Sequence, residues 1–116
     1  MRLSKVVRAG KAMERPFQLS VLVYQQGGLW IAQCVQYDIA AQGVSVPKAA
    51  EAFQWVFYSH VLLDEQKGRD PLSTVPPAPA HFEELFKNAI PLGVKSALPE
   101  IHADQTTVQE EFRLAA

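Results

Sequence analysis

Apolar and polar side chains alternate in the first patterned stretch of the chain, which is typical of a strand with one buried face. From Phe17 to Val23 every second side chain is apolar, and Leu22 adds one more apolar residue between them. Gly27 and Gly28 follow, and glycines accept the positive φ angles of a tight turn. The pattern therefore predicts a first strand that ends in a hairpin.

The same alternation continues after the turn. Residues 29–37 form a second candidate strand, Asp38 begins a turn, and residues 40–44 form a short third strand. These connections are short, so we expect a three-stranded antiparallel meander.

A long helix is predicted from residue 46 to about Gln66. Ser45 can cap its first turn, Pro47 is tolerated within that turn, and Gly68 suits the helix end. One helical stripe carries most of the apolar residues, and neighbouring positions widen it. The stripe comprises Ala49, Ala52, Phe53, Val56, Phe57, His60 and Leu63, and the widening residues are Trp55, Tyr58, Val61 and Leu62. One sheet face does not cover so wide a stripe, so we expect self-association.

The rest of the chain divides into a connector, a short helix and a final segment. Residues 71–79 hold four of the eight prolines, which predicts a stiff, extended connector. A short helix is expected at residues 80–89, and prolines and a glycine predict irregular structure at residues 91–104. Residues 108–114 alternate again and fit a strand or a short helix. We favour the strand, because it would complete the sheet.

The predicted fold class is therefore α+β: a three-stranded meander, one long helix packed on the sheet, a Pro-rich connector, a short second helix and a C-terminal strand. We expect a basic flexible leader at residues 1–16 and a β-β-β-α core at residues 17–70. Residues 71–116 complete the same domain.

Composition narrows the class of protein further. The 116 residues are 48% hydrophobic and 20% charged, which is ordinary for one globular domain. No stretch approaches the length of a membrane helix. The single cysteine excludes an internal disulfide framework and fits the cytoplasm.

The net charge of −1 is unevenly distributed. Five basic residues and one acidic residue give the leader a charge of +4, which leaves −5 for the remaining hundred residues. We expect no membrane binding, and nucleic-acid binding only through this leader. The leader is a solvated tail, a basic arm that touches phosphates, or, if Met13 is the natural start, an upstream extension.

The hairpin and the helix start carry a recognisable pattern. It consists of a hairpin glycine, an aromatic residue, an alternating strand, a short turn, a glycine before a polar cap, and an alanine in the helix. The positions are Gly28, Trp30, Ala32, Cys34, Asp38, Gly43, Ser45 and Ala49. In this pattern the chain resembles the HicB-like family, over about residues 17–90. The prolines of residues 72–79, followed by Phe82 and Phe86, look like a short stand-alone branch of that family.

The resemblance implies a partial ribonuclease-H-like fold and an antitoxin-like role. Typical HicB proteins bind and block a small RNA-cleaving toxin, and a separate C-terminal module binds DNA. Here residues 91–116 are too short and too broken by proline and glycine for a DNA-binding helix pair. Lys48 also stands where family members commonly carry an acidic residue. The resemblance therefore implies protein binding rather than DNA binding.

Candidate chemical groups are scattered along the sequence. Nuclease chemistry on two metal ions needs converging carboxylates, whereas Asp38, Asp64, Glu65 and Asp70 fall at turns and at the helix end. Cys34 lies mid-strand with no histidine near it in sequence, which predicts a buried, inert thiol. We therefore expect no catalytic residue, no cofactor and no enzymatic activity.

A metal site is a weak candidate. His60 and Asp64 are spaced i, i+4 on the predicted helix, a spacing that allows a shared metal. A third ligand would have to be His81 or His102. A packed histidine with one hydrogen bond is the commoner arrangement, so we expect no metal.

The sequence thus predicts a non-enzymatic, cytoplasmic protein-interaction module that forms a homodimer, and the HicB-like resemblance implies a small toxin-like protein as a further partner. The candidate contact residues are Trp30, Trp55, Tyr58, Phe82 and Phe86, and the candidate structural residues are Gly28, Asp38, Gly43 and Ser45. The alternative is a degenerate domain that binds a small molecule or a metal near His60.

Overall fold

A tight hairpin begins the part of the chain that the computed structural model describes, residues 17–94 and 108–116. β1 (Phe17–Gln26) pairs antiparallel with β2 (Leu29–Cys34). Gly27 and Gly28 form the turn with φ angles of 59° and 83°, a region that glycine enters without a Cβ clash. The predicted hairpin is confirmed.

Some predictions fall outside the described residues. These are the basic leader at 1–16, the candidate ligand His102, and residues 95–104 of the stretch expected to be irregular.

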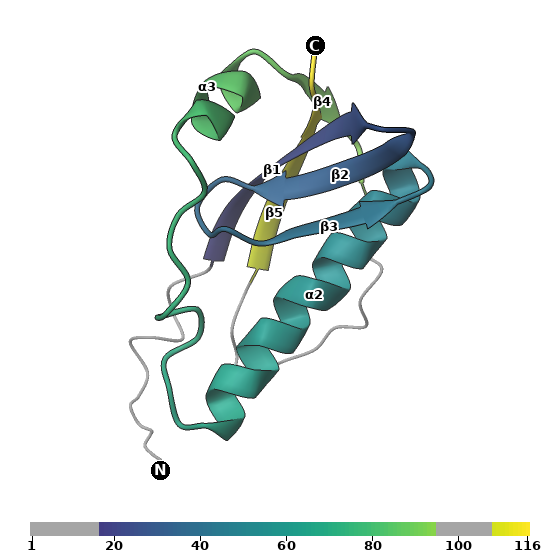
Figure 1. Ribbon diagram of the computed structural model, residues 1–116. Coiled ribbons are helices and arrows are strands. Elements are labelled where there is room, and N and C mark those ends of the chain that lie inside the picture. Colours follow the sequence, from purple (N-terminus) through teal and green to yellow (C-terminus); the bar gives the residue numbers. More distant parts are fainter. Residues whose placement is uncertain (1–16, 95–107) are drawn as a thin grey trace.

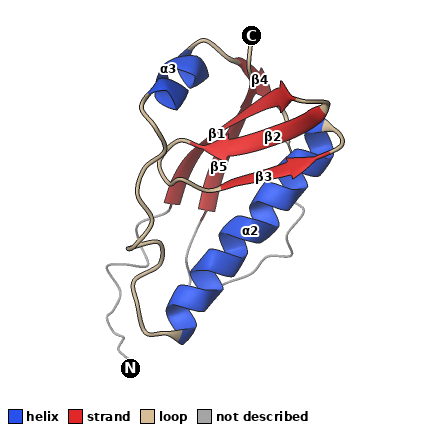
Figure 2. Cartoon of the chain, in the orientation of Figure 1, coloured by secondary structure: helices blue, strands red, loops and turns tan. Residues whose placement is uncertain are grey.

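The described residues form one five-stranded sheet, and Figures 1 and 2 show how its strands are arranged. β3 (Ala40–Gly43) continues the predicted meander, but the sheet also extends on the other side of β1. β5 (Val108–Leu114) lies parallel to β1, and β4 (Ile90–Leu92) pairs antiparallel with β5, so the order is β3-β2-β1-β5-β4. β4 corrects the prediction of irregular chain at 91–104. Pro91 is tolerated there because β4 is an edge strand.

The long helix, α2 (Val46–Gln66), packs on one face of the sheet (Figure 1). The Ser45 hydroxyl accepts a hydrogen bond from the Lys48 backbone N–H at 3.3 Å, and Gly68 follows the helix end with φ 70°. Both predicted helix ends are confirmed. Within the described residues, no helix combines the length and apolar character needed to cross a membrane.

Aromatic side chains hold α2 to the centre of the sheet. Phe53 and Phe112 of β5 meet edge to face with ring centroids 6.1 Å apart, and Phe57 meets Phe17 of β1 at 5.7 Å. These contacts join segments from both ends of the described chain into one core.

The buried stripe of α2 differs in phase from the prediction. Its buried residues are Ala49, Ala50, Phe53, Gln54, Phe57, Val61 and Asp64. Leu63, which we placed in the stripe, is 46% exposed. The reason is that two polar side chains, Gln54 and Asp64, occupy buried positions that apolar periodicity does not recognise.

The second helix, α3 (His81–Lys87), lies against the opposite face of the sheet and is shorter than the predicted 80–89. The proline-rich connector reaches it by passing the loop between β2 and β3. There the Pro76 carbonyl accepts a hydrogen bond from the Asp38 N–H at 2.7 Å. Leu22, which points away from α2, is fully buried on this second face.

Gly43 brings β3 into very close contact with the first turn of α2. A Cβ added at Gly43 would lie 2.5 Å from the backbone nitrogen of Ala49, closer than real atoms approach. Because the obstacle is backbone, the helix and strand would have to separate to admit a side chain.

We expect Gly43→Ala to lower the free energy of unfolding by about 1–3 kcal/mol, through overpacking at this contact. Gly93→Ala is the matched control, because no atom of the described residues lies within 4 Å of a Cβ added at Gly93. Urea denaturation of both variants measures the difference. Equal stability of the two variants would contradict the assigned role of Gly43.

Candidate interaction surface

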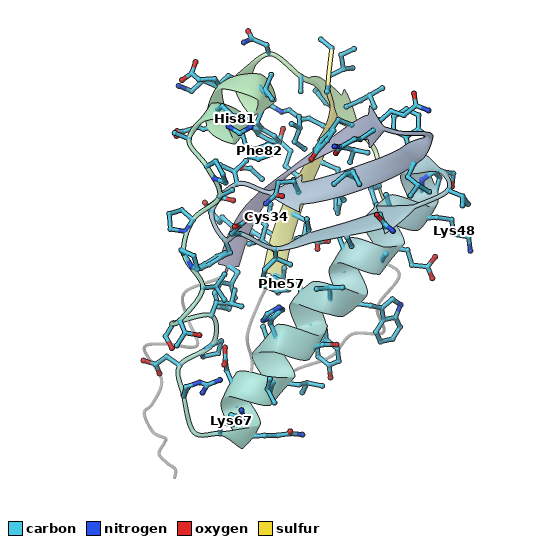
Figure 3. All side chains as sticks on the ribbon, viewed as in Figure 1. Cys34, Lys48, Phe57, Lys67, His81 and Phe82 are labelled. Carbon is cyan, nitrogen blue, oxygen red and sulfur yellow. The ribbon has the colours of Figure 1, made fainter. Side chains whose placement is uncertain are left out.

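The side of α2 that points away from the sheet carries an aromatic cluster. Residues two apart on a helix are separated by about 200°, so Trp55 points away from the buried Phe53 and Phe57. We call Trp55, Tyr58, Ser59 and Leu62 the outer face of α2. In Figure 3 the labelled Phe57 marks the inner side of this helix, below the sheet.

The outer face is partly exposed and internally ordered. Trp55 is 44% exposed, and its ring meets Tyr58 edge to face with centroids 6.4 Å apart. The Ser59 hydroxyl donates a hydrogen bond to the Trp55 carbonyl at 2.9 Å, and Leu62 is half-buried. The two large aromatic rings therefore contact each other on the same side of the helix.

This part of α2 carries no formal charge. From Ala52 to Leu63 the helix contains no Asp, Glu, Lys or Arg, although a solvent-facing helix side is normally polar or charged. Charges return at the first turns, where Lys48 and Glu51 pair at 3.9 Å. Depletion of charge and enrichment in Trp and Tyr are the features that mark the centre of protein interfaces.

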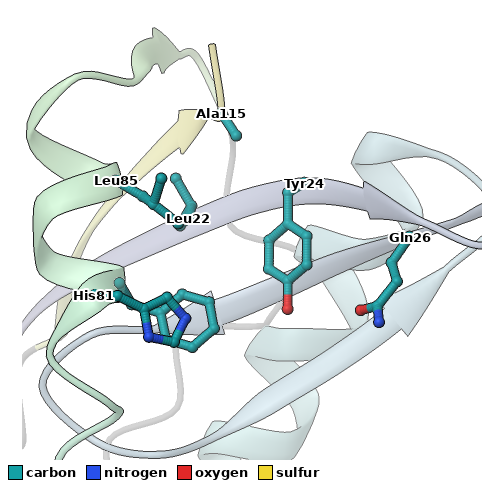
Figure 4. Close-up of a pocket in the computed structure, with 7 residues that line it drawn as sticks. Leu22, Tyr24, Gln26, His81, Leu85 and Ala115 are labelled. Atoms are coloured by element: carbon teal, nitrogen blue, oxygen red, sulfur yellow. The ribbon is translucent and has the colours of Figure 1, made fainter.

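A shallow groove of about 310 Å³ lies on the opposite face of the sheet, between α3 and β1 (Figure 4). Its lining is mostly apolar, and the rings of Tyr24 and Phe82 lie 6.0 Å apart across it. The lining residues are Leu22, Tyr24, Gln26, His81, Phe82, Leu85 and Ala115. Apolar side chains fit this groove, but its walls supply no set of charged groups that would select a particular ligand.

The five predicted contact residues lie in separate places. Trp55 and Tyr58 form the outer face of α2, and Phe82 lines the groove. Trp30 packs against the core cluster. Phe86 is only 9% exposed and lies under the Arg113 guanidinium, 4.3 Å from its ring centroid. Only the pair on α2 combines proximity with exposure.

Asp64 is a structural carboxylate. One oxygen accepts hydrogen bonds from the Arg69 guanidinium, the shorter at 2.9 Å, and the other accepts the Leu72 N–H at 2.7 Å. Leu72 has a φ of 62°, which leucine rarely adopts. The hydrogen bond from its N–H to Asp64 therefore stabilises the turn that follows α2. Burial acts to raise the pKa of Asp64, but the bonds from Leu72 and Arg69 outweigh it and hold the pKa below its usual value.

The other candidate chemical groups are also used structurally. Asp38 accepts a hydrogen bond from the Gln33 side chain at 3.1 Å. Burial raises the pKa of the Cys34 thiol, which disfavours the reactive thiolate. In the described ranges no three His, Cys, Asp or Glu side chains are grouped as metal ligands.

Sequence reasoning missed one partly buried polar contact. The Gln54 amide donates a hydrogen bond to the Glu110 carboxylate of β5 at 2.8 Å, and burial raises the pKa of Glu110. The available signal was Glu110 itself, an acidic residue on the face of β5 that otherwise alternates apolar.

Comparison with known proteins gives no relative from which a function could be transferred. No protein-family model matches the chain, and no curated protein and no solved structure matches it either.

We expect Asp64→Asn to lower the free energy of unfolding by about 2 kcal/mol at pH 7, because the charged hydrogen bonds to Arg69 and Leu72 are weakened. The folded pKa of Asp64 lies below its unfolded value. Its contribution is therefore complete above about pH 4 and is lost as the pH falls through the folded pKa. Urea denaturation at several pH values should show the two proteins converging in acid.

Asp70→Asn is the control, because Asp70 is exposed and, among the described residues, it accepts a hydrogen bond at its backbone carbonyl alone, from the Ser73 N–H. A gap between the wild type and Asp64→Asn that stays constant down to about pH 2 would contradict the role of the Asp64 charge.

Proposed function

We propose that this chain is a non-enzymatic protein-interaction module whose contact surface is the outer face of α2. The observation that carries the proposal is the uncharged stretch from Ala52 to Leu63, with Trp55 and Tyr58 on its solvent side. The inner side of the same helix is already used in the core. A second apolar side is not needed for the fold, and an interface is its most direct explanation.

The energetics of the outer face suit protein binding. Burying an exposed Trp and a neighbouring Tyr removes a large apolar area from water, and such residues are the usual hot spots of interfaces. The two rings already contact each other before binding, which reduces the rearrangement that association requires.

The state of the titratable groups supports a non-enzymatic role. Asp64 and Asp38 are engaged in hydrogen bonds that shape loops, and the Cys34 thiol is buried. These arrangements serve the fold. His81 and Tyr24 line the groove, but its lining residues include no carboxylate and no thiol that would act together with them.

The HicB resemblance of residues 29–49 extends the proposal to an antitoxin-like role, with a small toxin-like protein as a partner. The residues that carry the resemblance form the hairpin, β3 and the helix cap from which α2 begins. Co-expression with the protein encoded by the adjacent gene, followed by co-purification, tests this extension. If a toxin-like neighbour fails to co-purify, the antitoxin role is wrong.

We expect Trp55→Glu to weaken protein binding at the outer face of α2 by about 2 kcal/mol or more, because a charge would replace an aromatic side chain that the complex buries. Leu85→Glu is the matched control, since Leu85 is 48% exposed and lies on α3, beside the groove. Sedimentation equilibrium measures self-association, and titration calorimetry measures binding of a co-purified partner.

We expect each variant to change the unfolding midpoint by no more than an ordinary surface substitution does, which would show that both are folded. A contact that survives Trp55→Glu and is lost in Leu85→Glu would move the interface to the groove and contradict the proposal.

A further inference from the structure

We infer that the outer face of α2 binds the same face of a second copy of this chain, with the two helices antiparallel about a two-fold axis near Tyr58 and Ser59. This inference rests on the proposed function, because it names the partner of a face already argued to bind protein.

Charge favours a second copy over a charged partner. Three turns of α2, from Ala52 to Leu63, contain no formal charge, so this face offers nothing to steer or pair a basic or acidic protein. A second copy presents an equally uncharged face. The middle of the two faces therefore associates without desolvating an ion, and the charged pair of Lys48 and Glu51 lies towards the start of the helix.

Symmetry fixes which residues meet. In a two-fold interface the same patch occurs on both subunits, and an axis perpendicular to a helix makes the two helices antiparallel. The midpoint between Tyr58 and Ser59 is equally far along the helix from Trp55 and from Leu62. Each Trp55 therefore packs on Leu62 of the second copy, an aromatic ring against an aliphatic side chain.

Tyr58 and Ser59 lie equally near the axis, and the small Ser59 allows the helices to approach closely on its side. Ser59 is small and exposed, and its hydroxyl already bonds to the Trp55 carbonyl of its own helix. Burying it therefore leaves its donor satisfied. Helices with small residues at the crossing point pack with their axes about 8–10 Å apart.

The ends of the interface are compatible with the same register. Glu51 and Gln66 are equally distant from the axis, so Glu51 of one copy faces Gln66 of the other. The Glu51 side chain is 45% exposed and can accept a hydrogen bond from that amide. At these two positions a carboxylate meets a neutral amide, whereas Glu65 of one copy faces Ala52 of the other, next to Glu51.

Disulfide trapping tests the position of the axis. In a Cys34→Ala background, we expect Ser59→Cys to form a cross-linked dimer on mild oxidation on the order of tenfold faster than Glu84→Cys, because only the former brings two thiols together across the axis. Glu84 is the control because its side chain is 74% exposed on α3. Equal rates for the two variants would overturn the inference.

A mixture of two other cysteine variants tests the same register if Ser59→Cys disturbs the helix. Trp55→Cys and Leu62→Cys should cross-link to each other when mixed, and each should cross-link poorly with itself. Cross-linking of each variant with itself, at the rate of the mixture, would contradict the antiparallel register.

Tryptophan fluorescence separates failure of the inference from failure of the proposed function. In Trp30→Phe the only tryptophan is Trp55. We expect its emission to shift to the blue and its acrylamide quenching to fall as dimers form with rising concentration, with the mass measured by light scattering.

The other outcomes overturn different statements. A monomer whose Trp55 is freely quenched overturns self-association and leaves the outer face open to another protein. A monomer whose Trp55 is protected at every concentration means that this chain covers the face itself, which overturns both the inference and the proposed function.

Discussion

The packing of Phe53 and Phe57 against the central strands is the interaction on which the rest of the structure depends. Phe57 reaches Phe17 of β1, and Phe53 reaches Phe112 of β5, so two side chains one turn apart join strands from distant parts of the sequence. The same contacts set the rotation of α2 about its axis. Because these two rings point inward, Trp55 between them has to point outward, and the outer face follows from the core.

How much the sequence predicts depends on whether the cause is local. The hairpin at Gly28 and the cap at Ser45 follow from the chemistry of neighbouring residues, and both were predicted correctly. The prediction of which side of α2 is buried was wrong, because the burial of Gln54 depends on Glu110, which lies fifty-six residues away. Pro91 led to the prediction of irregular structure where β4 lies, because a proline is compatible with a strand only when that strand is at an edge.

The candidate surface was likewise predictable only where the cause lies in neighbouring residues. The excess of apolar residues around Trp55 is visible in the sequence, and it located the pair with Tyr58. The placements of Trp30 and Phe86 were not visible, because the core and the side chain of Arg113 cover them from distant segments. Asp64, which is buried, and Glu110, which is partly buried, have opposite linkage to pH. The pKa of Asp64 is lowered, so its stabilisation is lost in acid as the pH falls through the folded pKa. Burial raises the pKa of Glu110, so the folded chain disfavours its ionised form and stability falls as the pH rises through the folded pKa of Glu110.

The parallel pairing of β1 with β5 has a consequence for how the chain folds during synthesis. β1 leaves the ribosome early, but its second neighbour is made only after residue 108. Until then the hairpin and α2 can meet, while one side of β1 keeps unpaired backbone groups and Phe53 lacks Phe112. Closure of a loop of this length is slow, and a free strand edge is open to wrong pairing in the meantime. The nascent chain therefore passes through an aggregation-prone interval that ends when its last strand is inserted beside its first.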